Sequence, residues 1–455
     1  MEKLTLTMIA QYSNGHISEG AEKAEVFAIS TDSRRVSSGD LFVALKGERF
    51  DGHDFLEEAE RRGASALMVE KGARRKIPMV FVDDTTVGLQ RLAASYRDRF
   101  PVRTVAVAGS NGKTGTKELV AAVLGVRFSV LKSEGNLNNH IGVPLGLMRL
   151  DASHQLGVFE IGTNHPGELK PLAEMIRPVV GVITTIGEEH LEFFHDLEGV
   201  AREEGTLAEM LPREGLLILN ADDSWSAAIA RRGPATVAYF GFSGSAAYRA
   251  ERVKMDLDGA RFALRTPKGE KEIRLSLIGR HQVCNALAAA AVGEFFGLSL
   301  DEIARGLESA RPEKMRMERR MTPDDVLILN DAYNANPGSM RAALETLKEL
   351  PVSGKRIAVL GGMRELGEIS AEAHRDLGRR VAKSGLDVLL AVGIEAEGIA
   401  EGAREKRSSV QIECFATPAE AAEFLKRHTR RGDAVLVKAS RGVALERVLE
   451  EWIKE

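Results

Sequence analysis

The stretch AVAGSNGKTGTKELV, residues 106–120, decides the fold of this chain. A β-branched run from Val102 to Val107 precedes a glycine-containing turn, and a helix-forming run, Thr116 to Leu124, follows it. Such a strand, turn and helix form a cradle for phosphate, because backbone N–H groups of the turn point at anionic oxygens. We therefore predict a nucleotide-phosphate site made of Gly109, Ser110, Asn111, Gly112, Lys113, Thr114 and Gly115.

Two side chains of this loop carry the expected chemistry. The Lys113 ammonium would reach the terminal phosphates, and the Thr114 hydroxyl would face Mg²⁺. Without nucleotide, we expect Lys113 to face solvent. The spacing departs from the standard G-x-x-x-x-G-K-T pattern, because Val107 stands where the first glycine belongs. The alternative is a glycine-rich turn between a strand and a helix, with an incidental lysine.

Length and composition narrow the class of protein. A chain of 455 residues has room for roughly three domains, and 44% hydrophobic with 28% charged residues indicates a globular α/β protein. The net charge of −4 argues against a nucleic-acid partner. Two cysteines, Cys284 and Cys414, favour a reducing compartment. No apolar stretch approaches the roughly 20 residues that cross a bilayer, so we expect a cytoplasmic monomer without membrane insertion.

The order of strands and helices predicts the domain organisation. A first domain covers residues 1–100 and ends before Pro101, where a new apolar run begins. Residues 101–311 alternate strands and helices, which predicts a mostly parallel, doubly wound sheet. Within them, residues 251–278 alternate at period two and predict antiparallel hairpins. Residues 312–455 alternate again, which predicts a Rossmann-like α/β domain.

Two dense polar stretches mark the first domain, STDSRRVSSGD (30–40) and KGERFDGHDF (46–55). Ordinary turn chemistry accounts for their Gly, Asp and Ser residues. Alternatively they bind a polyanionic ligand, because arginine forks match phosphate geometry. The candidate residues are Ser33, Arg34, Lys46 and Arg49.

Polar residues also follow the predicted strands of the middle domain. Glu160 ends a strand beside the phosphate loop, a place that suits a Mg²⁺ ligand, although a helix or turn cap is the alternative. His190 is either a metal ligand or a satisfied polar group. Asn138 and Asn139, in SEGNLNNHIGVPL (133–145), either line the cleft or belong to a turn before an Asn-capped helix.

The C-terminal domain offers a similar set at its strand ends. Asp331 and Asn334 follow the first strand, and their alternative role is to cap the helix that begins near Pro337. Lys438 and Ser440 follow the last strand. This turn either presents a cation to an anion or leaves Lys438 in solvent.

The chain resembles the Mur ligase family over its full length. The motifs that carry the resemblance are TDSRRVSSGDLFVALKGERFDGHDF, GSNGKTGTKE, GNLNNHIGVPL, EIGTNHPGEL, HLEFF, NALAAAA, NDAYNANPGSM, GGMRELGE and VLVKASR. It implies three domains with a central P-loop ATPase domain. It also implies ATP-dependent ligation of D-alanyl-D-alanine to UDP-N-acetylmuramoyl-tripeptide, in peptidoglycan precursor synthesis. A sister ligase with a similar N-terminal motif carries a DNPR-type motif, which this sequence lacks.

The resemblance implies roles for individual residues around ATP. Lys113 binds the β- and γ-phosphates, Thr114 and Glu160 hold one Mg²⁺, and Glu160 and His190 hold a second.

Further from the loop, Asn285 contacts the adenine, Asp331 the ribose and Arg316 the γ-phosphate. Met315 departs from the family, in which a glycine usually precedes this arginine. The implied substrate-binding residues are Ser33, Arg34, Lys46, Arg49, Asn138, Asn139, Asn334, Asn336, Lys438 and Ser440.

The largest departure concerns a lysine that Mur ligases carbamylate. Alignment on GVAREEGTL (199–207) places Glu204 at that position, and no lysine occurs between Lys170 and Lys254. A glutamate carries permanently the charge that a carbamate gains from CO₂. We therefore predict that Glu204 lies near the second Mg²⁺. The alternative is an ordinary surface acid.

Two other functions stay open at this point. A folylpolyglutamate synthase would share the phosphate loop and the ATP chemistry, but it would not need the N-terminal DSR…GDLFVAL segment. A non-catalytic nucleotide-binding scaffold would need the loop without Glu160 and His190.

Overall fold

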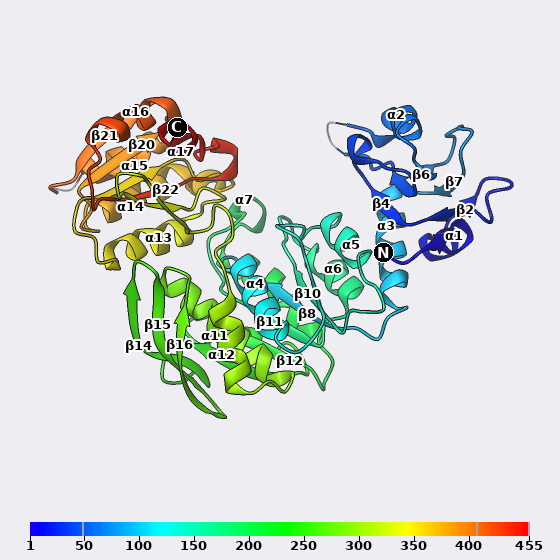
Figure 1. Ribbon diagram of the computed structural model, residues 1–455, viewed down its shortest axis with the longest axis horizontal. Coiled ribbons are helices and arrows are strands. Elements are labelled where there is room, and N and C mark those ends of the chain that lie inside the picture. The colour runs from blue at the N-terminus through cyan, green and yellow to red at the C-terminus, as the bar shows by residue number, and fades with distance from the viewer. Residues whose placement is uncertain (48–49, 406–407, 454–455) are drawn as a thin grey trace.

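The computed structural model describes residues 1–47, 50–405 and 408–453. Figure 1 shows the chain as an N-terminal, a central and a C-terminal α/β domain, with the central domain between the other two. Among the described residues, no helix combines the length and the apolar character that crossing a membrane demands. The domain boundaries at residues 100 and 311 stay predictions.

The N-terminal domain is built on a sheet of strand order β2-β7-β6-β5-β4. Strands β4 to β7 are parallel, whereas β2 pairs antiparallel with β7, and β1 and β3 form a separate antiparallel pair. The carboxyl ends of β4 and β5 therefore meet at one edge, where the two polar stretches begin. The elements are β1 (Leu4–Thr5), α1 (Leu6–Ser13), β2 (His16–Ile17), β3 (Glu25–Val26), β4 (Ala28–Ser30), η1 (Ser33–Arg35), β5 (Asp40–Val43), η2 (Gly52–Phe55), α2 (Leu56–Arg61), β6 (Ala66–Glu70), β7 (Met79–Val82) and α3 (Thr85–Arg97).

Helix α3 attaches this domain to the central one. Its buried residues Leu92 and Tyr96 belong to the same apolar cluster as Ile176 of the central domain. The Tyr96 hydroxyl donates to the Leu150 carbonyl oxygen at 2.7 Å and accepts the Glu2 N–H at 2.7 Å. A continuous core thus joins the two domains.

The central sheet has the order β16-β15-β14-β13-β12-β11-β8-β10-β9. Strands from β9 to β13 are parallel, which confirms the doubly wound prediction. The predicted hairpins of residues 251–278 are confirmed as β14 to β16, and β14 pairs with β13, so they extend the same sheet. The elements are β8 (Arg103–Ala108), α4 (Lys113–Leu124), β9 (Val130–Lys132), α5 (Gly142–Leu147), β10 (Leu156–Glu160), α6 (Leu169–Ile176), β11 (Val180–Ile183), α7 (Leu191–Phe194), α8 (Leu197–Glu204), α9 (Thr206–Glu209), β12 (Leu216–Asn220), α10 (Ser226–Ile229), β13 (Thr236–Gly241), β14 (Tyr248–Asp256), β15 (Gly259–Thr266), β16 (Gly269–Leu275), α11 (Arg280–Phe295) and α12 (Leu300–Ser309).

The C-terminal sheet has the order β17-β18-β22-β19-β20-β21, and all neighbours are parallel except β17 and β18. The predicted alternation of strands and helices in this domain is confirmed. Strand β17 was not predicted, because its sequence ERRM lacks an apolar alternation. The elements are β17 (Glu318–Met321), β18 (Leu327–Asn330), α13 (Pro337–Glu349), β19 (Arg356–Leu360), η3 (Gly367–Ile369), α14 (Ser370–Val381), β20 (Val388–Val392), η4 (Ile394–Ala396), α15 (Glu397–Arg404), β21 (Gln411–Phe415), α16 (Pro418–His428), β22 (Ala434–Lys438), η5 (Arg441–Val443) and α17 (Arg447–Trp452).

Candidate active site

The phosphate loop lies between the central strand β8 and helix α4, as the sequence predicts. Gly109 and Gly112 have φ angles of 109° and 89°, a region that favours glycine. A Cβ at Gly109 would lie 2.5 Å from the Thr184 hydroxyl oxygen, and one at Gly112 would lie 2.6 Å from the Asn285 Oδ1. Both glycines are therefore required by backbone conformation and by space.

Lys113 turns back onto this loop instead of facing solvent, so that expectation was wrong. Its Nζ donates to the Gly109 carbonyl oxygen at 2.6 Å and lies 3.3 Å from Glu189 Oε2, with only 16% of the side chain exposed. Burial by itself lowers the pKa of Lys113, but the carboxylates of Glu189, Glu204 and Glu160 outweigh it and raise the pKa. The ammonium is thus held charged where phosphates would arrive.

Glu160 is a buried carboxylate at the end of β10, next to β8 in the sheet. Its Oε1 accepts the Asn138 amide at 2.8 Å, whereas its Oε2 is buried without a hydrogen-bond partner. A buried carboxylate oxygen without a partner is costly, so this oxygen fits a cation ligand better than a cap. Thr114 is also buried, at the start of α4.

His190 lies in the turn between β11 and α7, with a φ of 47°. Its Nδ1 lies 2.9 Å from Glu365 Oε2 of the C-terminal domain. Within the described ranges, no three His, Cys, Asp or Glu side chains converge on a preformed metal site. A Mg²⁺ with one or two protein carboxylates, waters and substrate phosphates needs no such cluster, so the residues present fit this ion.

Glu204, the last residue of α8, is buried with 2% of its surface exposed, which rules out a surface acid. Its Oε2 accepts the Gly109 N–H at 2.7 Å. Burial, with the nearby Glu189 carboxylate, raises the pKa of Glu204 to about 8, although the Lys113 ammonium opposes this shift. The structure thus brings Glu204 to the phosphate loop, and a metal contact stays a prediction. The expected permanent charge is wrong, because a carboxyl group with a pKa of about 8 is largely protonated at neutral pH.

Asn285 and Arg316, which the sequence predicts to contact ATP, lie on different elements. Asn285 of α11 lies against Gly112 and accompanies Gln282, whose Oε1 accepts its amide at 3.2 Å. Arg316 stacks over the Tyr333 ring, 4.0 Å from its centroid, and its Nε lies 3.5 Å from Glu313 Oε2.

Asp331 and Lys438 lie together, on neighbouring strand ends. The Lys438 Nζ is 2.6 Å from Asp331 Oδ2 and donates to the Asn334 carbonyl oxygen at 2.9 Å. Lys438 is 2% exposed, so a position in solvent is excluded. Asn336, and neither Asp331 nor Asn334, caps helix α13.

The remaining C-terminal candidates organise the loops around this pair. The Ser440 hydroxyl donates to the Ala335 carbonyl oxygen at 3.1 Å and accepts the Arg364 N–H at 2.9 Å. The Asn336 amide donates to Asn111 Oδ1 of the phosphate loop at 2.9 Å. In the central domain, the Asn139 Oδ1 accepts the Ile141 N–H at 3.2 Å and the Gly142 N–H at 2.8 Å, in the turn before α5.

The N-terminal candidates lie apart from the phosphate loop, at the carboxyl edge of their own sheet. Arg34 is exposed and forms a two-point contact with Asp32, with Nε–Oδ1 and Nη2–Oδ2 distances of 2.9 Å. This hydrogen bonding lowers the pKa of Asp32 to about 2. Ser33 lies in the same η1 turn as Arg34. Lys46 follows β5, the strand that pairs with β4. Arg49 lies outside the described residues.

Several residues near the site were missed by sequence reasoning. Glu189 stands in GEEHLEFF directly before His190, and its proximity in sequence to a predicted ligand was the available signal. Two ion pairs that join the central and C-terminal domains were also missed. Arg341 Nη1 lies 3.2 Å from Glu188 Oε2, and Glu365 pairs with His190. No local pattern marks such a pair.

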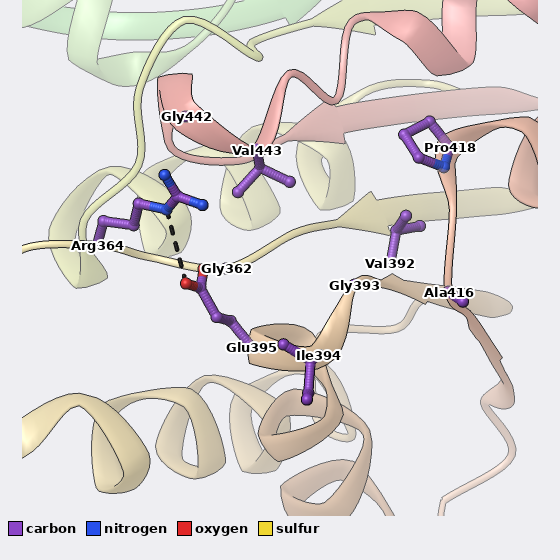
Figure 2. A pocket seen from close by; sticks show the side chains of 10 residues that line it. All are labelled: Gly362, Arg364, Val392, Gly393, Ile394, Glu395, Ala416, Pro418, Gly442 and Val443. Atoms are coloured by element: carbon purple, nitrogen blue, oxygen red, sulfur yellow. Dashed lines mark ion pairs between the residues drawn. The ribbon is translucent and has the colours of Figure 1, made fainter.

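A hollow lies at the carboxyl edge of the C-terminal sheet, and among the described residues none of the predicted site residues lines it. It has a volume of about 240 Å³, and the Arg364–Glu395 ion pair, 3.6 Å apart, lies along it (Figure 2). The loop after β19 that contributes Arg364 also carries Glu365.

Family models match most of this chain, and they match it in the order of its domains. They are the Mur ligase family, catalytic domain, at residues 25–127, the Mur ligase middle domain at residues 107–293, and the Mur ligase, glutamate ligase domain, at residues 315–441. With the phosphate loop and the three-domain fold, these matches define the class: the chain belongs to the Mur ligase family.

Individual relatives indicate which ligase of this family the chain is similar to. The chain is 37% identical to the UDP-N-acetylmuramoyl-tripeptide--D-alanyl-D-alanine ligase of Escherichia coli (strain K12), over 99% of this chain and 98% of that protein. A MurF crystal structure from Acinetobacter baumannii matches with a TM-score of 0.93 and 33% identity, covering 100% of both chains. MurF ligase from Thermotoga maritima in complex with ADP matches with a TM-score of 0.84 and 31% identity, covering 94% of this chain and 97% of that one.

Lys113→Ala tests the loop. We expect ATP turnover to fall by at least roughly two orders of magnitude, about 3 kcal/mol of barrier, because the variant loses the charge that we predict to meet the transferred phosphoryl group. We also expect a lower unfolding midpoint, because the buried Glu189 carboxylate, 3.3 Å from the Lys113 Nζ, loses its balancing cation. Turnover and thermal unfolding are measured beside Lys268→Ala, which removes an exposed lysine at a hairpin turn. Near-normal turnover of Lys113→Ala would contradict this site.

Proposed function

We propose that this chain joins D-alanyl-D-alanine to the terminal carboxylate of UDP-N-acetylmuramoyl-tripeptide, with conversion of ATP to ADP and phosphate. The reaction belongs to peptidoglycan precursor synthesis. The observation that carries the proposal is the full-length similarity to a ligase of this name, 37% identity over 99% of the chain. The phosphate loop, with the buried ammonium of Lys113, supports the proposal through the chemistry of the site.

The reaction divides into two steps. The tripeptide carboxylate attacks the γ-phosphorus of ATP, the bond to the β,γ-bridging oxygen breaks, and an acyl phosphate and ADP form. The amine of D-alanyl-D-alanine then attacks the acyl carbon, loses a proton and expels phosphate. Lys113 and Arg316 stabilise the charge on the transferred phosphoryl group. Closure of the domains around the site excludes water that would hydrolyse the acyl phosphate.

Mg²⁺ fits the carboxylate and hydroxyl groups beside the loop. We propose that Thr114 and Glu160 hold one ion, and that Glu160, His190 and Glu204 lie around a second. When bound, the ions neutralise phosphate charge. The orphaned Glu160 Oε2 supports this assignment.

The other candidates divide between the substrates. Ser33, Arg34 and Lys46 bind the UDP group at the carboxyl edge of the N-terminal sheet. Asn285 contacts the adenine and Asp331 the ribose, with Lys438 fixing Asp331 through their 2.6 Å contact. We further propose that Asn138, Asn139, Asn334, Asn336 and Ser440 shape the cleft for the peptide substrates, and that the enzyme is a cytoplasmic monomer.

Phosphate release and product formation test the function directly. Purified protein is incubated with ATP, Mg²⁺, D-alanyl-D-alanine and a UDP-tripeptide that ends in either meso-diaminopimelate or lysine. We expect phosphate release only with both peptide substrates present, and a new UDP-pentapeptide by mass spectrometry. Turnover with a folate and glutamate would favour a folylpolyglutamate synthase, and binding without any turnover would favour a scaffold.

Arg34→Ala tests the role of the N-terminal domain. We expect weaker binding of the UDP-tripeptide and a nearly unchanged Kd for ATP, because Arg34 lies on a different domain from the phosphate loop. Calorimetry with each ligand measures this. Arg74→Ala serves as the control because it removes another exposed arginine of the same domain. An equal loss for both ligands would count against the assignment.

Glu204→Gln tests the replacement of the carbamylated lysine. We expect the Mg²⁺ concentration for half-maximal turnover to rise. Glu204, with a pKa of about 8, can release its proton to become a carboxylate ligand, whereas the amide of the variant cannot. We also expect the unaltered enzyme to be indifferent to bicarbonate. The control is Glu198→Gln, an exposed acid in the same helix α8. If Glu204→Gln keeps both the Mg²⁺ dependence and the turnover, the replacement idea fails.

A further inference from the structure

Three consecutive residues of the central domain, Glu188, Glu189 and His190, divide their contacts between two domains. The middle residue, Glu189, is buried and lies 3.3 Å from the Lys113 Nζ of the phosphate loop. The outer two reach across to the C-terminal domain. Glu188 pairs with Arg341 of α13 at 3.2 Å, and His190 Nδ1 lies 2.9 Å from Glu365 Oε2.

The backbone around the His190–Glu365 contact adopts an uncommon conformation on both sides. His190 and Glu365 have φ angles of 47° and 64°, both in the left-handed region that non-glycine residues seldom occupy. Such strain persists only where the surrounding structure imposes it, and it is concentrated at functional sites. Nearby, a Cβ at Gly367 of η3 would lie 3.2 Å from the Cα of Glu192 in α7, so these two short helices approach closely.

The loop that carries Glu365 is held firmly by its own domain. The Met363 N–H donates to His374 Nε2 at 2.9 Å, and His374 is buried. The Arg364 N–H donates to the Ser440 hydroxyl at 2.9 Å, and the Arg364 side chain pairs with Glu395 (Figure 2). Glu365 is therefore presented to His190 from a fixed base.

We propose that Arg341 and Glu365 are positioning residues for the ligation, which fix the segment Glu188–His190 when the C-terminal domain docks. Glu365 holds His190 as an ion pair, because its Oε2 lies 2.9 Å from Nδ1 although the two groups are not aligned as a hydrogen bond. This contact leaves the His190 Nε2 for a ligand, and carboxylates commonly position metal-binding histidines from that side. Arg341 fixes Glu188, and the neighbouring Glu189 thereby keeps its place against Lys113. This inference rests on the proposed function and adds to it a link between domain docking and the phosphate loop.

The variants Glu365→Gln and Arg341→Met test this link in the full-length protein. The matched control is Arg319→Met. Arg319 of β17 forms another ion pair between the same two domains, 2.7 Å from Asp258, and neither partner belongs to the segment Glu188–His190. Steady-state kinetics separate kcat from the KM of each substrate. A second measurement counts free Mn²⁺ by electron paramagnetic resonance in the presence of a non-hydrolysable ATP analogue.

We expect Glu365→Gln to weaken Mn²⁺ binding and to lower kcat, each by about 10- to 100-fold, the usual effect of losing a partner of a metal-binding histidine. Arg341→Met is expected to lower kcat with a smaller change in Mn²⁺ affinity. The KM for UDP-tripeptide stays unchanged in both, and Arg319→Met behaves like the unaltered enzyme.

Two results would overturn the inference. One is that Glu365→Gln and Arg341→Met both match the unaltered enzyme in kcat and Mn²⁺ affinity. The other is that Arg319→Met loses as much as they do, which would indicate domain docking in general. If Glu365→Gln does not fold, Arg341→Met carries the test through kcat. Failure of the unaltered enzyme to ligate the dipeptide would instead refute the proposed function, so the two failures are distinguishable.

Discussion

The ammonium of Lys113 balances the charge of a buried acidic cluster, and the active site depends on this balance. Glu189, Glu204 and Glu160 all act on it, and they hold its pKa above the usual value despite burial. A buried charge without a partner destabilises a protein by several kcal/mol, so each member constrains the others. The loop takes part as well, because the Gly109 N–H donates to Glu204 and the Gly109 carbonyl oxygen accepts from Lys113.

This cluster extends into the C-terminal domain through short polar contacts. Asn336 reaches Asn111 of the phosphate loop, and Arg341 and Glu365 reach the residues on either side of Glu189. The N-terminal domain is joined to the central one by an apolar core around α3. An apolar contact also joins the central and C-terminal domains, because Ile278 belongs to the C-terminal core cluster. Polar contacts exchange readily with water, whereas an apolar core is costly to open. The joint beside the phosphate loop contains contacts of both kinds.

The sequence predicted the local structure of the site well. The strand, glycine turn and helix of residues 106–120 were confirmed, as were the hairpins after residue 250 and the strands of the C-terminal domain. These features depend on periodicity and turn residues, which are local. Residue type alone does not predict the backbone at position 315, where the resemblance expects glycine. Met315 has a φ of 61°, in the left-handed region that favours glycine. Here the fold keeps the backbone conformation although the residue type has changed.

The sequence by itself determined the domain order, the sheet classes, the phosphate loop and the family. Only the tertiary structure decided how the charged side chains pair. Lys438 binds Asp331, 107 residues earlier in the chain, instead of facing solvent, and Lys113 lies beside Glu189, 76 residues later in the chain. Glu204 is buried although its neighbours Arg202 and Glu203 make it look like part of a charged surface helix. The physical reason is that pairing and burial depend on which strand ends meet in the folded sheet, and the local sequence does not encode such long-range contacts.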